Sequence, residues 1–310
     1  MSRYVNVCAL GPCAMPENPA TNREAIEKMI GWWREHLDQV WPYEPDLVIL
    51  PEACDRYAQF SPERRREYYE ERGHKIRDFL AGEARAHRCY LAYSAARQMP
   101  DKKWRNTTEI IDRRGGTAGL YHKNHLTRGE HDESGLSFGT EAPLIKCDFG
   151  TVACAICFDL NFEELRGRYK PLRPDIIAFS SMYHGGLAQK IWAYDCQSYF
   201  VGAVANLRCD VLSPQGEIMA SSTSYRWYAN ARVNLDRELV HLDFHGDKLR
   251  AAKEKYRSKI NISVPDFLGS VLLTSETEDF TVQDVMKEFG MISWRDYYAA
   301  SLRHREANLK

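Results

Sequence analysis

The segment 151–164 is the feature that most constrains what this chain can fold into. It reads Thr-Val-Ala-Cys-Ala-Ile-Cys-Phe-Asp-Leu-Asn-Phe-Glu-Glu. Small apolar and β-prone residues lead to Cys157, and the acidic residues that follow favour the start of a helix. A strand that turns into a helix at Cys157 exposes its thiol beside backbone N–H groups, whose partial positive charge favours a thiolate and an oxyanion. We therefore predict a nucleophilic Cys157; the alternative is a cysteine that only fills core space.

Composition and charge exclude several classes of protein. The 310 residues are 44% hydrophobic, which is enough for a large core in one or two domains. The net charge is −1 with both signs mixed, so no nucleic-acid or polybasic membrane footprint is indicated. We find neither a signal-peptide core at the N-terminus nor an apolar run that spans a bilayer. Nine cysteines, odd in number and mostly inside apolar runs, indicate reduced thiols, so we expect a cytoplasmic protein.

Two short apolar runs, 47–50 and 176–179, each follow a Pro-Asp pair. Each is typical of a strand that is buried on both faces, and their similarity predicts similar layers in the two halves of the chain. Glu52 comes directly after the first run. Ligands of open α/β folds bind at the carboxyl ends of such strands, and an acid this close to a buried strand usually has a specific partner.

The remaining pattern predicts alternating helices and strands. Thr21 and Glu24 have the spacing of a capping box in front of an amphipathic helix. A second helix is predicted over 61–88, and its run 63–67 (Glu-Arg-Arg-Arg-Glu) is interpreted as a solvated face with ion pairs. Strands are predicted at 89–95, 107–112 and 117–121, and Lys123 follows the last of them.

Three motifs together resemble the nitrilase superfamily of carbon–nitrogen hydrolases. Leu47-Val48-Ile49-Leu50-Pro51-Glu52 is similar to the segment that carries the catalytic Glu of that family. Tyr121-His122-Lys123-Asn124-His125-Leu126 is similar to the segment with its Lys, and Ala155-Ile156-Cys157-Phe158-Asp159-Leu160 to the segment with its nucleophile. Each motif alone is unspecific, but all three occur in the order of the family. Lesser matches are Asn106-Thr107, the loop from Glu133 to Gly139, and Asn206.

The resemblance covers residues 4–260 and implies an α/β fold, a four-layer α-β-β-α sandwich of the nitrilase type. Such subunits commonly pair into a longer stack, so we expect a homodimer or a higher homo-oligomer. We assign residues 1–270 to the catalytic domain. Residues 271–310 are predicted to form a C-terminal extension, partly helical, that packs on the body or at an oligomer interface.

The same resemblance implies a role for each site residue. Cys157 would attack an amide carbon, Glu52 would accept its proton, and the Lys123 ammonium would stabilise the oxyanion. The backbone N–H of Phe158 is a second oxyanion donor, and Glu133 resembles an additional Glu that orients the substrate or the Lys. Glu130 is the alternative for that role. No metal and no organic cofactor are needed.

The substrate class follows from the residues after the nucleophile. Phe158-Asp159 resembles amidase and carbamoyl-hydrolase members, whereas nitrile-hydrolysing members usually carry Trp-Glu. Leu160-Asn161 stands where N-carbamoyl amino-acid hydrolases hold a carboxylate with an arginine pair, so carboxylate binding there is in doubt. Substitutes for that pair are Arg166, Arg168 or Arg208. We predict hydrolysis of a small linear amide or N-carbamoyl compound. The alternatives are nitrile hydrolysis or acyl transfer with the same residues, and a non-catalytic scaffold.

Two further clusters have a chemical and a structural interpretation. Cys154 and Cys157 have the spacing of a redox pair, but strand alternation would direct their thiols to opposite faces. His241, Asp243, His245 and Asp247 would share one face of a strand and would suit a metal. We interpret them instead as the wet face of an edge strand.

Overall fold

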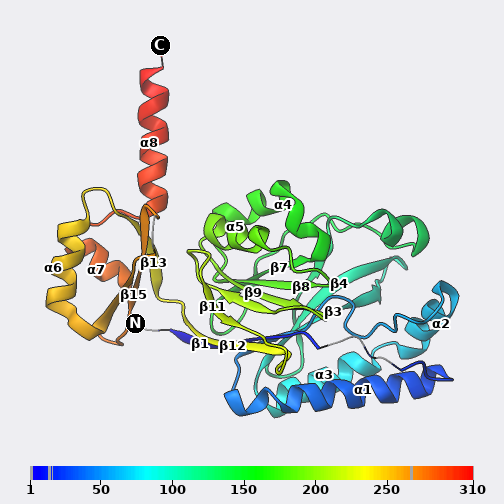
Figure 1. The fold of residues 1–310 in the computed structure, drawn as a ribbon. Helices are drawn as coiled ribbons and strands as arrows, with labels where there is room; N and C mark the ends of the chain where they lie inside the picture. Colours follow the sequence, from blue (N-terminus) through cyan, green and yellow to red (C-terminus); the bar gives the residue numbers. More distant parts are fainter. Residues whose placement is uncertain (1–2, 13–14, 16, 266–267, 310) are drawn as a thin grey trace. The chain divides into compact units, whose positions relative to one another are not determined.

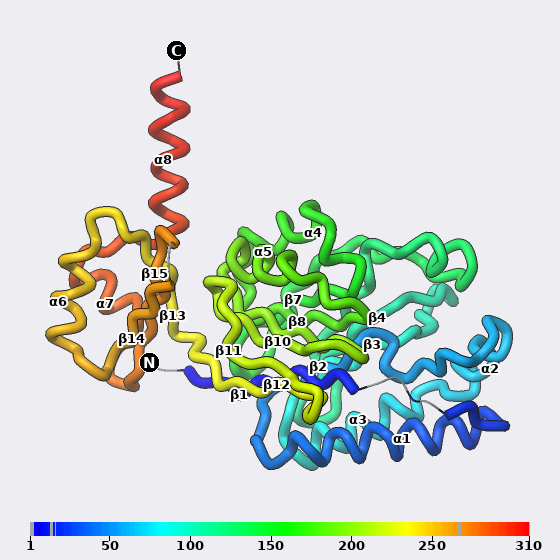
Figure 2. The backbone as a smooth tube through the Cα atoms, in the orientation of Figure 1, coloured from blue at the N-terminus to red at the C-terminus, as the bar shows by residue number. Residues whose placement is uncertain are grey.

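A computed structural model of the protein describes residues 3–12, 15, 17–265 and 268–309. The chain divides into two compact units (Figures 1 and 2). The larger unit contains residues 6–232, and the smaller contains the N-terminal residues up to Val5 together with the chain from Val233 onwards. Each is described separately below.

The larger unit is built on two six-stranded sheets. The first has the order β12-β1-β2-β3-β4-β5, with β1 (Tyr4–Leu10), β2 (Leu47–Ile49), β3 (Tyr90–Gln98), β4 (Trp104–Ile111), β5 (Thr117–His122) and β12 (Tyr228–Asn234). The second has the order β11-β10-β9-β8-β7-β6, with β6 (Ile145–Lys146), β7 (Thr151–Ile156), β8 (Ile176–Ser181), β9 (Tyr199–Val204), β10 (Asp210–Leu212) and β11 (Ile218–Ser221).

Helices cover the outer faces of both sheets (Figure 1). On the first lie α1 (Asn22–Asp38), α2 (Pro62–Arg72) and α3 (Lys75–Ala86), and on the second lie α4 (Glu163–Tyr169) and α5 (Leu187–Cys196). Short 3-10 turns lie between helices and strands at Trp41–Tyr43, Cys157–Asn161 and Lys170–Leu172, and a π turn spans Gly129–Glu133. This arrangement is the predicted α-β-β-α sandwich.

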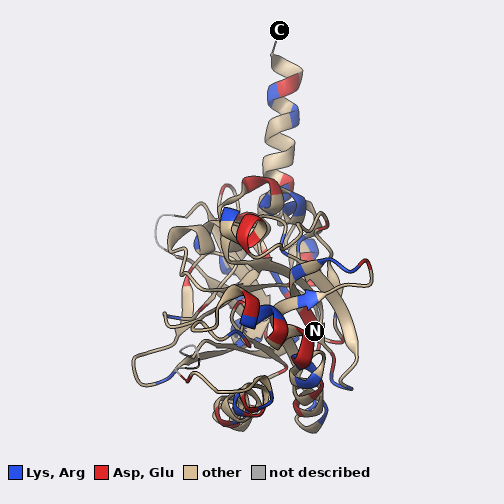
Figure 3. Cartoon of the chain, turned by 90° about the vertical axis from the view of Figure 1, so that its right-hand side faces the viewer, with Lys and Arg blue, Asp and Glu red and all other residues tan. Residues whose placement is uncertain are grey.

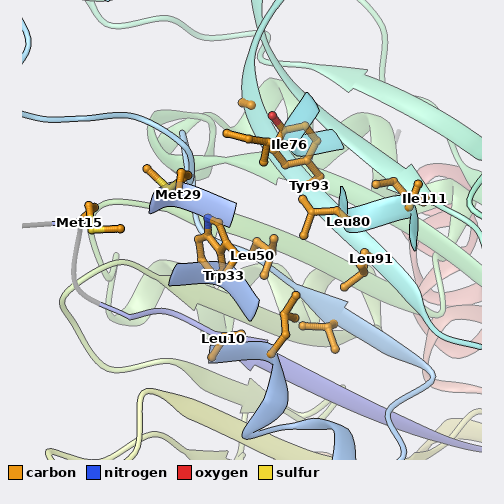
Figure 4. Close-up of a cluster of buried hydrophobic side chains, with 14 of the residues drawn as sticks. Leu10, Met15, Met29, Trp33, Leu50, Ile76, Leu80, Leu91, Tyr93 and Ile111 are labelled. Carbon is orange, nitrogen blue, oxygen red and sulfur yellow. The ribbon is translucent and has the colours of Figure 1, made fainter. Parts of the chain in front are cut away.

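The cap and the apolar stripe predicted for α1 are both present. The Thr21 side chain accepts from the backbone N–H of Glu24, and the Glu24 carboxylate accepts from Ala20. Met29 and Trp33 lie one turn apart on the buried face and join the core between α1, α3 and the first sheet (Figure 4). The amphipathic pattern therefore serves to cover the sheet.

The two halves repeat the same arrangement around Asp46 and Asp175. Each residue precedes the middle strand of three parallel strands, β2 in β1-β2-β3 and β8 in β7-β8-β9. The Asp46 carboxylate accepts from the backbone N–H of Asn6 at 2.9 Å, and Asp175 accepts from that of Thr151 at 2.9 Å. The repeated Pro-Asp pattern thus marks corresponding layers, as predicted.

The prediction of one charged helix over 61–88 is wrong. The helix ends at Arg72, and Gly73 adopts a φ of +49°, a conformation that glycine accepts without the steric cost of a Cβ. The chain then restarts as α3. The interpretation of 63–67 as a face of ion pairs is also wrong, because Arg64, Arg65 and Arg66 form no ion pair with any residue that the structure describes.

The smaller unit contains an antiparallel sheet of order β13-β15-β14. Its elements are β13 (Arg237–His241), α6 (Gly246–Tyr256), a 3-10 turn (Arg257–Lys259), β14 (Ile260–Ser263), β15 (Ser270–Ser275), α7 (Val282–Glu288) and α8 (Trp294–Asn308). Helices α6 and α7 share an apolar cluster with the sheet. The boundary predicted at 270 falls on the first residue of β15; as a functional division it stays a prediction.

Figure 3 shows acidic and basic residues interspersed along the chain, as the net charge of −1 leads one to expect. Among the described residues, no helix combines the length and the apolar character needed to cross a membrane.

Candidate active site

Cys157 lies at the sharp turn that the sequence predicts. Strand β7 ends at Ile156, and a 3-10 turn begins at Cys157 itself. Cys157 has a φ of +47°, in the left-handed region that a residue with a Cβ enters at a cost of about 1–2 kcal/mol. This conformation redirects the chain at the thiol, and the flanking strand and turn hold it in place.

Glu52 and Lys123 also follow strands, β2 and β5, and they meet in the interior. The Lys123 ammonium donates to Glu52 Oε1 at 2.7 Å, and the two residues are 1% and 5% exposed. The backbone of Lys123 donates to Asn106 O and accepts from Gly139 N. A Cβ on Gly139 would lie 2.2 Å from His122 O, so only glycine permits this approach.

Glu130, and not Glu133, is the second acid that contacts Lys123. Both Glu130 carboxylate oxygens lie 2.8 Å from Lys123 Nζ. The amide of Asn106 donates to Glu52 at 2.9 Å and to Glu130 at 3.0 Å, so it links the two carboxylates. The geometry therefore favours the alternative that the sequence left open, whereas Glu133 lies exposed on the wall of the same cavity.

One cavity brings the predicted residues together. It has a volume of about 290 Å³, which is near the lower end of the range for small-molecule sites. Glu52, Lys123 and Cys157 all line it, together with Glu130 and Glu133. Because Cys157 comes from the second sheet and the other two from the first, the site forms where strand ends of the two sheets meet.

Burial and the charge of Glu52 raise the pKa of the Cys157 thiol to about 11, although the charge of Lys123 and a hydrogen bond from the Met182 backbone act in the opposite direction. The Glu52 carboxylate and the thiol line the same cavity. The sequence suggested a thiolate stabilised by the turn; at neutral pH the structure instead favours a protonated thiol with a carboxylate beside it.

The charges around Lys123 stabilise one another. Burial alone would lower the pKa of Lys123, but the charges of Glu52 and Glu130 hold it above its usual range. Burial would likewise raise the pKa of Glu130, yet the Lys123 charge and the hydrogen bonds to the carboxylate hold it below its usual range. Lys123 is therefore an ammonium throughout the physiological range, as an oxyanion donor must be.

Asp159 connects the cysteine segment to the lysine segment, a role that sequence reasoning missed. Its buried carboxylate accepts from Tyr121 OH at 2.6 Å, from the backbone N–H of His125 at 2.8 Å and from that of Ile156 at 3.0 Å. The only sequence signal was an acid two residues after the cysteine. His125 Nδ1 lies 3.0 Å from the same carboxylate, so this histidine also ties the loop to Asp159.

Phe158 lies beside the cavity. Its side chain is 36% exposed and packs edge-on against Phe162, with ring centroids 5.1 Å apart. It is absent from the described residues that line the cavity, and the oxyanion role of its backbone N–H stays a prediction.

The three arginines considered as carboxylate ligands are engaged elsewhere. Arg166 pairs with Asp195 at 2.8 Å and Arg208 with Asp210 at 2.9 Å. Arg168 lies 3.7 Å from Glu164 and 4.0 Å from Glu141. None of the three is among the described residues that line the cavity.

Neither the Cys154–Cys157 redox pair nor the His and Asp metal cluster considered in the sequence analysis is formed among the described residues. Cys154 is fully buried in β7, whereas Cys157 lies at the cavity, and both are free thiols. The predicted strand through 241–247 ends at His241, where the ring stacks on Tyr297, and His245 accepts from the backbone of Ile292. Over the described ranges no group of three or more His, Cys, Asp or Glu side chains has a metal-binding arrangement.

Comparisons with known proteins agree with this fold. The family model described as carbon-nitrogen hydrolase matches residues 10–231. A carbon-nitrogen hydrolase from Helicobacter pylori G27 is similar in structure, with a TM-score of 0.63 and 15% identity over 76% of this chain and 90% of that one. Nit3 of Saccharomyces cerevisiae, a member of the nitrilase superfamily, has a TM-score of 0.59 and 20% identity over 83% and 95%.

A mutant of the amidase from Nesterenkonia sp. AN1 is also similar. Its TM-score is 0.60 at 15% identity, covering 74% of this chain and 93% of that one. That structure shows the result of Michael addition of acrylamide at the active-site cysteine of the amidase. No curated protein matches the sequence. At these identities the structural likeness establishes the fold, and the family model establishes the family.

Proposed function

The chain belongs to the carbon–nitrogen hydrolase family, and we propose that it hydrolyses a small linear amide or N-carbamoyl compound through a thioester on Cys157. The single observation that carries this proposal is the meeting of a thiol, a carboxylate and an ammonium on one cavity. Considered separately, each residue has an ordinary structural role. Together they supply a nucleophile, a base and an oxyanion donor.

The first step forms the acyl-enzyme. Cys157 Sγ attacks the amide carbon, and its proton passes to the Glu52 carboxylate, which lines the same cavity. Because the pKa of the thiol is about 11, little thiolate is present beforehand, and proton transfer accompanies the attack. The Lys123 ammonium stabilises the negative charge that develops on the amide oxygen.

The second half of the cycle releases both products. The tetrahedral intermediate collapses as Glu52 returns the proton to the departing nitrogen, and ammonia or an amine leaves. Glu52 then takes a proton from water, which attacks the thioester, and the acid is released as the thiol regains its proton. Glu130 and Asn106 hold Lys123 and Glu52 in position. The cycle uses no metal and no organic cofactor.

Two observations support an amide or carbamoyl group over a nitrile. Phe158-Asp159 after the nucleophile resembles the amidase and carbamoyl members. The similar protein from Nesterenkonia sp. is described as an amidase and has the same fold. Nitrile hydrolysis, acyl transfer to another acceptor and a non-catalytic scaffold are the competing outcomes of the test below.

Ammonia release from amides, N-carbamoyl compounds and nitriles, with intact-protein mass spectrometry, tests the proposal. We expect turnover of the first two groups and an acyl adduct that Cys157→Ala removes. Cys147→Ala is the matched control, because this half-buried cysteine is outside the described lining of the cavity. Robust nitrile turnover would refute the substrate class; no adduct with any of these compounds would favour a scaffold.

We also propose that the chain acts as a homodimer or a higher homo-oligomer in the cytoplasm, with 1–270 as the catalytic part. Light scattering coupled to size exclusion measures the mass in solution. A monomer at micromolar concentration would contradict the first part of this proposal.

A further inference from the structure

One face of helix α2 forms a wall of the active-site cavity. Of its residues, Pro62, Arg65, Arg66 and Tyr69 line the cavity. Their positions i, i+3, i+4 and i+7 are those that share one side of an α-helix. The helix therefore directs two consecutive arginines to the cavity, and Arg56, in the turn before it, adds a third guanidinium to the lining.

These three guanidiniums have polar contacts but no carboxylate partner among the residues that the structure describes. Arg56 Nη2 donates to Met182 Sδ at 2.9 Å, Arg65 Nη2 to Phe60 O at 3.0 Å, and Arg66 Nη2 to Ser134 O at 3.2 Å. All three side chains are half-buried. Arg65 Nε is fully buried, and it has no hydrogen-bond partner among the residues that the structure describes.

Three nearby arginines outside the cavity lining are paired with acids. Arg72 pairs with Asp55 at 2.6 Å, Arg77 with Glu109 at 2.8 Å, and Arg97 also contacts Glu109. Among the described residues, the three arginines that face the cavity have no acid partner, and neither has the adjacent Arg64, which lies outside the lining. A half-buried guanidinium with free donors is costly unless an anion pairs with it, and its planar fork matches a carboxylate.

We propose that Arg56, Arg65 and Arg66 form an anion subsite that binds a carboxylate at the far end of the substrate. This inference rests on the proposed function, and it defines the substrate as a short molecule with an amide or carbamoyl group at one end and a carboxylate at the other. A dicarboxylic acid monoamide and an N-carbamoyl amino acid both satisfy this description.

The charge distribution gives such a substrate one orientation. Glu52 and Glu130 place two carboxylates around one ammonium near Cys157, so a substrate carboxylate is repelled from the reacting end. The arginines of the lining attract it instead. Glu133 also lines the cavity, but it forms no ion pair with the three arginines among the described residues. One carboxylate, that of Glu133, cannot balance three guanidiniums, so this part of the lining keeps an excess of positive charge.

The volume agrees with a short substrate. About 290 Å³ accommodates a small molecule but not a large one. The proposed subsite also differs in place from the Leu160-Asn161 position after the nucleophile, where the sequence put carboxylate binding in doubt. Two of its three arginines lie on α2. In the sequence, the charged run that contains them is interpreted as a solvated helix face.

Three amides of nearly equal size test the charge preference: the monoamide of succinic acid, succinic diamide, and 3-aminopropanamide. Their far ends are anionic, neutral and cationic. We expect kcat/KM for the monoamide to exceed that for the diamide by about 10- to 100-fold, the contribution of a charge-assisted hydrogen bond, and to exceed that for the cation by more. Equal or inverted values would overturn the subsite while leaving the proposed function intact.

Matched variants on α2 locate the preference. Arg65→Gln and Arg66→Gln are expected to raise KM for the monoamide and to bring its kcat/KM ratio to the diamide toward one. Arg64→Gln is the control, since Arg64 donates to Asn18 and Pro19 and lies over the Phe60 ring. A ratio that Arg64→Gln alone changes would refute the assignment. No acyl adduct on Cys157 with any of these amides would instead refute the proposed function.

Discussion

Two buried ion pairs have acids that are only three residues apart in sequence, but the surroundings of the two pairs differ. Glu52 pairs with Lys123 at 2.7 Å, and Asp55 pairs with Arg72 at 2.6 Å. The Asp55 carboxylate is fully enclosed, with Tyr93 OH as a further donor and Arg72 donating also to Ala96 O. Glu52 instead lines a cavity together with the Cys157 thiol.

The difference shows which kind of buried charge can do chemistry. An enclosed pair has no room for a substrate, and its partners serve to offset the cost of its own burial. A pair with one side open to a cavity has the same burial but retains a place where a reacting atom can lie. Burial and ion pairing alone therefore do not identify a functional acid. The distinguishing feature is that one side of the carboxylate faces a cavity.

The largest effect is expected for Glu52→Gln. Loss of the base should lower kcat for any substrate that the protein turns over by about 10²- to 10⁴-fold, the usual contribution of general acid–base catalysis. The variant should still fold, because glutamine has nearly the same shape. Circular dichroism and steady-state kinetics check the two parts. Activity near that of the unchanged protein would show that the open pair is as structural as the enclosed one.

Asp55→Asn should lower the stability of the fold and leave the catalytic activity in place. It leaves the buried Arg72 guanidinium without its counter-charge, so we expect the free energy of unfolding to fall by about 3–5 kcal/mol. Urea unfolding measures this loss. In the fraction that remains folded, kcat for an amide substrate should stay close to its original value, because Asp55 is not among the described residues that line the cavity. A selective loss of kcat in fully folded protein would contradict the comparison.

The charge of Glu52 should also be detectable in the reactivity of Cys157. Because that charge helps to raise the pKa of the thiol to about 11, the thiolate is the minor form at pH 8, and its fraction rises tenfold per pH unit until about pH 11. Removing the charge in Glu52→Gln lowers the pKa, so alkylation by iodoacetamide at pH 8 should become faster, roughly tenfold per pKa unit.

The control for this measurement is Asp55→Asn, which should leave the pH profile of Cys157 alkylation in place. If Glu52→Gln slows alkylation or leaves its pH profile unchanged, Glu52 does not act on the thiol electrostatically.

The smallest effect is expected for Tyr93→Phe. The change removes one donor to the Asp55 carboxylate without altering the ring, so the free energy of unfolding should fall by about 1.5–3 kcal/mol. Thermal or urea unfolding measures the loss, and Cys157 alkylation should be unaffected. A change in alkylation of the folded variant would mean that the enclosed pair and the open pair are coupled.

Much of the fold was predictable because it depends on local pattern. The strands at 47–49 and 151–156 are apolar runs with clear ends, and the capped helix after Thr21 has an apolar stripe. The break at Gly73 was missed because charged residues on both sides continue a helical pattern, and only the positive φ of the glycine ends it. The strand expected through 241–247 was wrong because the chain turns after His241.

The site was predictable in part. Glu52, Lys123 and Cys157 stand out because each directly follows a strand and belongs to a recognisable motif. The choice between Glu130 and Glu133 was left open, because both lie in one polar loop and only the π turn directs Glu130 to Lys123. The role of Asp159 was missed, since Tyr121 and His125, which it joins to the cysteine segment, lie more than 30 residues away in the chain.

The sequence by itself determined the α/β layers, the family resemblance and the residue types of the reacting group, because these follow from periodicity and from short motifs. Only the tertiary structure decided which charges meet. It joined Lys123 to Glu130, enclosed Asp55 while leaving Glu52 open, and directed Arg65 and Arg66 to the cavity. The physical reason is that the pairing and the solvent exposure of a charge depend on groups that the chain brings together only when it folds.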